Sequence, residues 1–292
     1  MSVGLTLLGF EWTYVVATAV VLGALAVLFG VGLAVASRAL RVHLDPRIEQ
    51  IESVLPGVNC GACGYGGCSA YAAAVVAGDI GPSECVPGGI DVARQAAAVM
   101  GLEAEEKEKR VAVVFCQGGN RAADRFAYEG ITDCRAAVIT QDAAKGCRWG
   151  CIGLGTCARA CPFGAIVMGD DGLPHVIEDR CTACGTCAEV CPKGIISILP
   201  ARNMVHVLCR SRDKGAEVRR VCPVGCIGCK QCEKVCPVEG GAVHVTDFLA
   251  RVDVATCISC GKCVQVCPMG TIGSFRLSRR GGPGKVKGQE AA

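Results

Sequence analysis

Short cysteine runs of one repeated spacing constrain this chain more than any other feature of its sequence. In each run three cysteines are separated by two residues, a fourth follows after three more, and a proline comes next. The runs are Cys181, Cys184, Cys187 and Cys191, then Cys257, Cys260, Cys263 and Cys267, with a third copy at Cys226, Cys229, Cys232 and Cys236. This spacing is the ligand pattern of bacterial [4Fe-4S] ferredoxins, in which three neighbouring thiolates bind one cube and the fourth binds the adjacent cube. The pattern predicts a chain that transfers single electrons.

Disulfides or zinc could also account for 24 cysteines in 292 residues. Disulfide scaffolds are usually short secreted chains, which this sequence does not resemble. Zinc sites usually combine two cysteine pairs across a longer loop, whereas three thiols at this spacing suit a cube. Because only 4% of the residues are aromatic, a large conventional core is not available. We therefore expect cluster binding to supply much of the folding free energy and the metal-free chain to be poorly structured.

An uncharged segment, residues 13–36, is long enough to span a bilayer as a helix. Two arginines, Arg38 and Arg41, follow it. Because basic residues favour the cytoplasmic side, the sequence predicts a single-pass anchor in the cell (inner) membrane, with the N-terminus outside and the Fe-S domains in the cytoplasm. A cleaved signal peptide is the alternative, since residues 34–36 resemble a cleavage site. The chain lacks a basic n-region, however, and its apolar run exceeds the usual length of such a peptide.

A second kind of cysteine site follows a short helix predicted over residues 45–55. Its four thiols are Cys60, Cys63, Cys68 and Cys85, at a spacing that differs from that of the ferredoxin runs. The glycines between the first three cysteines permit the sharp turns that direct thiolates inward. We expect one [4Fe-4S] cube here, with zinc as the alternative. A mixed-charge stretch, residues 101–110, then predicts a solvated linker.

The remaining cysteines repeat along the chain. Six positions, Cys147, Cys151, Cys157, Cys161, Cys181 and Cys191, recur about 75 residues later as Cys222, Cys226, Cys232, Cys236, Cys257 and Cys267. The repeat predicts two tandem double-cluster modules. The segment that begins each repeat is similar as well, since residues 113–116 resemble residues 205–209. The first copy carries an insertion that includes Cys134. We expect short strands near residues 165–167 and 194–198, and a short helix after the third cysteine of each run.

One ligand is missing from the first copy, because Leu154 stands where the second copy has Cys229. Cys147 is the nearest replacement in the sequence. The expected cubes then bind to Cys147, Cys151, Cys157 with Cys191; Cys181, Cys184, Cys187 with Cys161; Cys226, Cys229, Cys232 with Cys267; and Cys257, Cys260, Cys263 with Cys236. The cysteines left over, Cys116, Cys134, Cys209 and Cys222, could hold a sixth cube or stay free buried thiols. Since Cys147 and Cys222 are equivalent in the repeat, their roles could be exchanged or shared.

These features predict an α+β chain with one N-terminal transmembrane helix, a small, mostly helical four-cysteine module and two tandem ferredoxin-like modules. The expected boundaries are 1–41 for the anchor, 42–95 for the four-cysteine [4Fe-4S] domain, 96–112 for a charged linker, 113–200 and 201–272 for the ferredoxin-like modules, and 273–292 for a disordered basic tail. The sequence contains no motif for binding nicotinamide, flavin or ATP, so we expect those sites on other subunits and no complete active site on this chain.

The order of these modules resembles the B subunit of the Rnf complex in its long, cysteine-rich bacterial form. The resemblance covers about residues 10–272 and is most specific in residues 56–68 (PGVNCGACGYGGC) and 150–163 (GCIGLGTCARACPF). It implies an electron-transfer subunit of a ferredoxin:NAD+ oxidoreductase, which accepts electrons from reduced ferredoxin. Electrons would pass through at least five [4Fe-4S] clusters, with a sixth expected, to flavin-bearing partners and finally NAD+. The resemblance also implies coupling to Na+ or H+ translocation.

The expected partners are the other membrane and peripheral subunits of such a complex, soluble ferredoxin and membrane lipid, with no nucleic acid. Soluble ferredoxins are usually acidic, so docking would need a basic patch. Basic residues crowd one segment, at Arg210, Arg212, Lys214, Arg219 and Arg220, although they could instead balance cluster charge. A second class of function is a membrane-tethered polyferredoxin that serves another redox enzyme, such as a hydrogenase, or stores electrons, without ion coupling. A zinc-based interaction module is the third.

Overall fold

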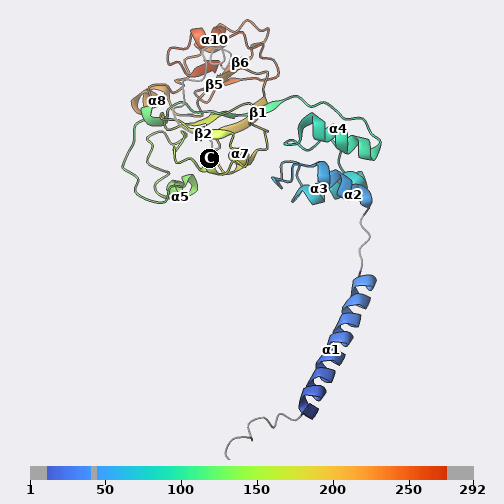
Figure 1. Cartoon of the computed structure of the whole chain (residues 1–292). Coiled ribbons are helices and arrows are strands. Elements are labelled where there is room, and N and C mark those ends of the chain that lie inside the picture. Colours follow the sequence, from blue (N-terminus) through green and yellow to red (C-terminus); the bar gives the residue numbers. More distant parts are fainter. Residues whose placement is uncertain (1–11, 41–44, 275–292) are drawn as a thin grey trace, which may run out of the picture. The chain divides into compact units, whose positions relative to one another are not determined.

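The computed structural model describes residues 12–40 and 45–274 (Figure 1). It divides into two units, residues 1–46 and 47–292, which are described separately. Almost all of the tail expected to be basic and disordered, residues 273–292, lies outside the described residues.

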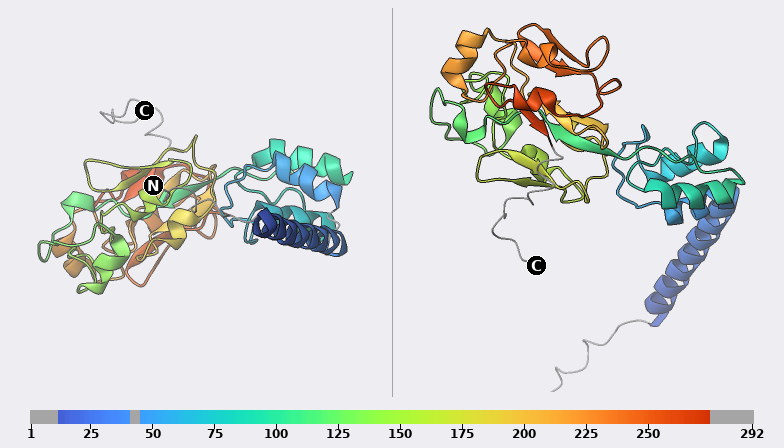
Figure 2. Two further views of the ribbon diagram at one scale, coloured as in Figure 1. Left: turned by 60° about the horizontal axis from the view of Figure 1, so that its bottom comes forward. Right: turned by 90° about the horizontal axis from the view of Figure 1, so that it is seen from above.

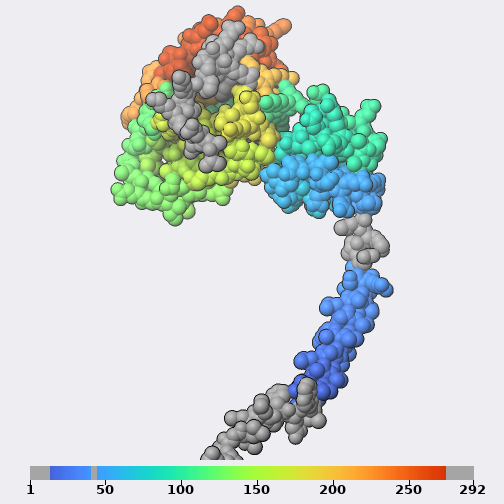
Figure 3. Space-filling view, viewed as in Figure 1, coloured from blue at the N-terminus to red at the C-terminus, as the bar shows by residue number. Residues whose placement is uncertain are grey.

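The first unit consists of one long helix, α1 (Trp12–Ala39). Among the described residues, its segment Tyr14–Ala39 is the one helix long and apolar enough to cross a membrane. Its large apolar side chains, including Leu22 and Phe29, are exposed along its whole length (Figure 3). Apolar surface of this extent is stable only against lipid or another apolar surface. The helix therefore fits the membrane anchor that the sequence predicts.

The four-cysteine module is built from three helices, α2 (Pro46–Val54), α3 (Cys68–Ala77) and α4 (Gly89–Met100). Its core contains Ile51, Leu55, Tyr71, Ala72, Val75 and Ala96, and the small alanines let the helices approach closely. Both α3 and α4 end at a glycine in the left-handed region, because the following backbone N–H groups turn back to bond the last carbonyls. The helix α4 continues to Met100, past the domain boundary expected at residue 95.

Each ferredoxin-like module is an outer strand pair enclosing an inner hairpin (Figure 2). In the first module β1 (Arg110–Val114) pairs antiparallel with β4 (Ile196–Pro200), and β2 (Ile166–Met168) pairs with β3 (Pro174–Val176). In the second module β5 (Val205–Val207) pairs with β8 (Ile272–Ser274), and β6 (Val243–Thr246) pairs with β7 (Leu249–Val252). Because the first and last strands of each module pair with one another, each copy of the sequence repeat closes on itself.

Four short helices carry the third cysteine of a run in each case. They are α6 (Thr156–Arg159), α7 (Thr186–Glu189), α9 (Gln231–Lys234) and α10 (Lys262–Gln265), so each begins one residue before that cysteine rather than after it. The residue before each helix has a positive φ, at Gly155, Gly185, Lys230 and Gly261. This left-handed residue reverses the chain within one step and brings the cysteines on either side of it toward a common point.

Three further helical segments complete the described fold: η1 (Gly119–Arg121), α5 (Cys134–Ile139) and α8 (Gly215–Val221). The apolar cores of the two modules are small. The second module's core has six aliphatic residues, Val205, Val207, Val243, Leu249, Ala250 and Ile272, beside the cysteines Cys226, Cys232 and Cys263. The cysteines are thus part of the core itself, so whatever binds them also holds the module together.

We predict that Gly228→Ala destabilises the second module more than Gly261→Ala. Both glycines have a positive φ, which costs an alanine about 1–2 kcal/mol. At Gly228 the added methyl group would also lie 2.8 Å from the backbone oxygen of Phe248, whereas at Gly261 nothing lies within 4 Å. Thermal loss of the visible cluster absorbance measures the difference, and equal midpoints in the two variants would contradict it.

Candidate iron-sulfur sites

All 24 cysteines lie in the described part of the chain, and none of them forms a disulfide. They gather into groups drawn from the four-cysteine module and from both ferredoxin-like modules. Five cavities in the described structure are each lined by at least four of these cysteines.

In the four-cysteine module, the expected thiols line one cavity of about 330 Å³, namely Cys60, Cys63, Cys68 and Cys85. Asn59 organises the loop, because its Oδ1 accepts the backbone N–H of Cys68 at 2.7 Å at the start of α3. Tyr71 closes the cavity from α3 and donates its hydroxyl to the carbonyl oxygen of Gly81 at 3.0 Å. Burial raises the pKa of Tyr71 to about 12, so this side chain stays a neutral donor.

The second ferredoxin-like module groups its cysteines in the crossed manner that the spacing predicts. One cavity is lined by Cys226, Cys229, Cys232 and Cys267. The other is lined by Cys236, Cys257, Cys260 and Cys263. In each cavity three thiols come from one run and the fourth comes from the other run, which the closed strand pairs bring across the module. Each set could hold one [4Fe-4S] cube.

The first module gathers a different set from the one expected. A cavity of about 370 Å³ is lined by Cys134, Cys151, Cys157 and Cys191, and Cys147 is not among its residues. This cavity brings Cys134 together with Cys151, whereas Cys147 meets Cys151 at a different cavity. In the neighbouring group, Cys187 interacts electrostatically with Cys181 and Cys184 of its own run and with Cys157 and Cys161 of the other run.

Several hydrogen bonds fix Cys134 at the position that Leu154 leaves without a thiol. Thr156 Oγ1 accepts the backbone N–H of Cys134 at 2.8 Å and donates to Asp133 at 3.1 Å. Asp133 caps α5 by accepting the backbone N–H groups of Arg135 and Ala136, and these bonds lower the pKa of its carboxyl group. The insertion and the missing ligand occur in the same copy of the repeat. Their occurrence in the same copy is the feature of the sequence that could have indicated Cys134 as the replacement thiol.

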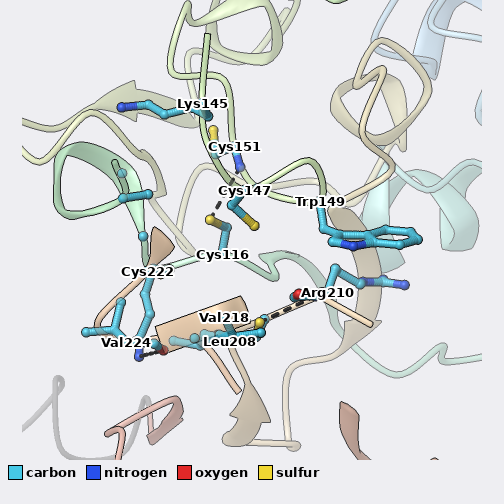
Figure 4. A pocket seen from close by; sticks show the side chains of 18 of the residues that line it. Cys116, Lys145, Cys147, Trp149, Cys151, Leu208, Arg210, Val218, Cys222 and Val224 are labelled. Atoms are coloured by element: carbon cyan, nitrogen blue, oxygen red, sulfur yellow. Dashed lines mark hydrogen bonds between the residues drawn. The ribbon is translucent and has the colours of Figure 1, made fainter. Parts of the chain in front are cut away.

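The cavity that does contain Cys147 is a separate one. Its volume is about 480 Å³, and its cysteines are Cys116, Cys147, Cys151, Cys209 and Cys222 (Figure 4). Of the four cysteines that the sequence left over, three therefore meet here, and Cys147 takes the place of Cys134 among them.

Burial raises the pKa of nine of the 24 thiols, and neighbouring cysteines add to the effect. The pKa of Cys157 rises to about 11 and that of Cys187 to about 12. At neutral pH such groups are protonated thiols unless a cation replaces the proton. Backbone N–H groups are directed at several of the sulfurs, for example from Ala250 to Cys226 Sγ at 3.5 Å and from Thr271 to Cys267 Sγ at 3.3 Å. These bonds stabilise a thiolate that is bound to iron.

The spread of the thiols distinguishes a cluster from a single ion. Zinc bonded to four cysteines holds their sulfurs about 3.8 Å apart, as follows from a Zn–S distance of about 2.3 Å. In the described residues, no group of three or more His, Cys, Asp or Glu side chains converges closely enough to bind one metal ion. The cysteines instead line separate cavities in sets of four. This arrangement fits a four-iron cube.

Family models match three parts of the chain. An Fe-S cluster family matches residues 55–87, and two different 4Fe-4S dicluster domain families match residues 137–198 and 219–268. Cys116 and Cys209 lie outside all three matches, whereas Cys147 and Cys222 lie inside them.

Among curated proteins, the chain is similar to the B subunit of an ion-translocating oxidoreductase complex from Methanosarcina acetivorans, with 48% identity over 81% of this chain and 91% of that protein. It is 44% identical to the B subunit of a Na+-translocating ferredoxin:NAD+ oxidoreductase complex from Acetobacterium woodii, over 70% of this chain and 62% of that longer protein. It is also 44% identical to the B subunit of a proton-translocating ferredoxin:NAD+ oxidoreductase complex from Clostridium ljungdahlii, over 71% of this chain and 74% of that protein.

An apolar helix of membrane-spanning length, joined to modules that gather thiols around cube-sized cavities, defines an iron-sulfur electron-transfer protein with a membrane anchor. The similarity along most of the chain then identifies the family. The chain belongs to the B subunits of the Rnf-type ion-translocating oxidoreductase complexes.

We predict that Asn59→Ala lowers cluster occupancy in the four-cysteine module, because the N–H of Cys68, the first residue of α3, loses its acceptor, at a cost of about 1 kcal/mol. Asn59→Asp keeps an acceptor oxygen and should retain the cluster. Iron content and electron paramagnetic resonance of the reduced protein measure both variants. Equal occupancy in the two would show that Asn59 does not position Cys68.

Thr156 offers a comparable test in the first ferredoxin-like module. Thr156→Val should weaken one cluster there, because the buried N–H of Cys134 would lose its partner at a cost of about 1–3 kcal/mol. Thr156→Ser keeps the hydroxyl and serves as the matched control. The rate of iron release to a chelator is the measurement. Identical rates in the two variants would count against Cys134 as a ligand.

Proposed function

We propose that this chain is the anchored electron-transfer subunit of an Rnf-type complex, which accepts electrons from reduced ferredoxin and relays them to flavin-bearing membrane partners and ultimately to NAD+. The observation that carries the proposal is the series of crossed thiol groups on a chain whose only recognisable cofactor motifs are for iron-sulfur clusters. Clusters bound there would supply one-electron transfer. The ferredoxin and NAD+ in this proposal come from the names of the relatives.

The relatives also support coupling to ion translocation, which would take place in the partner subunits because one helix cannot form an ion path. Two relatives of equal identity to this chain are named for different ions, Na+ and H+, so the similarity supports either ion. We place the N-terminus outside and the iron-sulfur modules in the cytoplasm, since Arg38 and Arg41 follow the apolar segment.

We assign five cubes to the chain. The ligands are Cys60, Cys63, Cys68 and Cys85; Cys134, Cys151, Cys157 and Cys191; Cys161, Cys181, Cys184 and Cys187; Cys226, Cys229, Cys232 and Cys267; and Cys236, Cys257, Cys260 and Cys263. Four of these sets each line one cavity, which supports the assignment. For the third set, the electrostatic interaction of Cys187 with the other three cysteines supports it.

Exposure of the cysteines suggests where a soluble partner exchanges electrons. Of the 24 cysteines, Cys229 and Cys260 are the two exposed ones, and both belong to the second ferredoxin-like module. The exposed residues Lys230 and Lys262 lie beside them. An acidic ferredoxin would find positive charge there at the shortest distance from a cube. We therefore propose that electrons enter through the second module.

The expected basic patch divides in the structure into one half-buried residue, Arg210, and exposed ones. Arg210 lies 4.5 Å above the ring of Phe115 and donates to Ser197 Oγ at 2.7 Å. Arg212 lies 5.6 Å above the ring of Trp149. Arg219 and Arg220, in the last turn of α8, are exposed. The first two residues fit the balancing of cluster charge, and the last two fit a contribution to docking.

The module at Cys60–Cys85 would be the exit to the membrane, because few residues separate it from the anchor.

We predict that Cys63→Ala in the complete complex leaves rapid reduction of the other clusters by ferredoxin intact and abolishes NAD+ reduction. Stopped-flow absorbance and NADH formation measure the two steps, with iron analysis confirming that the other clusters are present. Loss of reduction by ferredoxin would reverse the proposed direction. Purification without flavin-bearing membrane subunits would favour the tethered polyferredoxin that serves another enzyme.

A further inference from the structure

Four of the five cysteines that line the cavity containing Cys147 occupy equivalent positions in the two repeats. Cys116 lies two residues after β1, and Cys209 lies two residues after β5, the corresponding strand of the second module. Cys147 and Cys222 each precede, by four residues, the first cysteine of a ligand run, Cys151 or Cys226. Each module therefore contributes the same two positions to one space. Chance burial of four unrelated thiols would not produce this correspondence.

The four sulfurs face that common space. A methyl group added at Gly118 would lie 3.3 Å from Cys222 Sγ and 3.7 Å from Cys116 Sγ, so these two thiols lie on the same side of this glycine. Cys147 interacts electrostatically with both of them, and Cys209 interacts with Cys147. Figure 4 shows Cys116 and Cys147 at the centre of the cavity, with Cys222 on one side. At about 480 Å³, the cavity is larger than the 330 Å³ at the four-cysteine module.

Hydrogen-bond donors are arranged around this space as they are around the ferredoxin ligands. The backbone N–H of Cys151 is directed at Cys116 Sγ at 3.4 Å, and that of Ser211 at Cys209 Sγ at 3.4 Å. Two residues that line the cavity, Trp149 and Arg210, each carry a buried N–H with no acceptor, at Nε1 and Nε respectively. Buried donors without an acceptor are costly, so these two require an acceptor such as the sulfur of a bound cluster.

Positive charge completes the site. Arg210 lines the cavity and packs against Phe115, and the exposed Arg212 packs against Trp149, which also lines the cavity. Figure 4 places Trp149 and Arg210 on the side away from Cys222. An oxidised cube with four thiolates carries a charge of about −2, which these guanidinium groups would partly offset. Free buried thiols are neutral and would account neither for the arginines nor for the two donors without acceptors.

We propose that Cys116, Cys147, Cys209 and Cys222 bind a sixth [4Fe-4S] cluster between the two ferredoxin-like modules. The site touches a ligand of a neighbouring cube in each module. Cys116 Sγ accepts the N–H of Cys151, and Cys209 interacts electrostatically with Cys226. The cluster would join the two modules into one electron path. This inference rests on the proposed iron-sulfur function. It adds to that function a cluster that connects the two ferredoxin-like modules.

The test is anaerobic quantification of iron and sulfide on the full chain purified in detergent. Six cubes predict about 24 iron atoms per chain, and five predict about 20. The double variant Cys116→Ala and Cys209→Ala should lose about four iron atoms and one paramagnetic resonance signal, while the others remain. Cys134→Ala is the matched control and should affect a different signal.

A wild-type content of about 20 iron atoms, unchanged in the double variant, would overturn the sixth site and leave the five-cube function standing. A content of zero with bound zinc would overturn both. If the double variant does not fold, the wild-type count decides between five and six cubes.

Discussion

The distance between the ligands of a four-iron cube is the constraint on which this fold depends. A single ion draws its ligands to one point, whereas a cube needs four thiolates spread around a volume. Residues of positive φ, such as Gly155 and Gly261, turn each run so that its first three cysteines surround one space. The antiparallel pairing of first and last strands then brings the fourth cysteine from the other run. With so few large apolar residues, the cores are completed by the ligands.

Burial and negative charge oppose one another in such a fold. Every thiol that is removed from water becomes harder to ionise, as the raised pKa values of Cys157 and Cys232, each about 11, show. The chain compensates with backbone N–H groups aimed at sulfur and with arginines placed against aromatic rings. The crowded basic segment after β5 is therefore only partly a surface feature, because Arg210 is half-buried while Arg212, Arg219 and Arg220 are exposed.

The sequence was sufficient to predict which cysteines group together where short loops between them determine their positions in the fold. The crossed groups of the second module and the Cys60–Cys85 group could be predicted from their motifs because short loops leave few alternatives. The grouping of Cys134 with Cys151 could not, since nearness in sequence favoured Cys147, whereas the N–H of Cys134 donates to Thr156 Oγ1 and holds this more distant cysteine there. The short helices also began earlier than expected, because the left-handed residue before each third cysteine already starts the turn.

The correspondence between Cys116 and Cys209, and between Cys147 and Cys222, has a consequence for biogenesis. Neither module alone holds more than two of these four thiols. During synthesis the first module emerges before the second, so a cluster bound by all four thiols could form only after both modules have folded and met. Its formation would then be a late step of maturation and would report that the two modules have assembled.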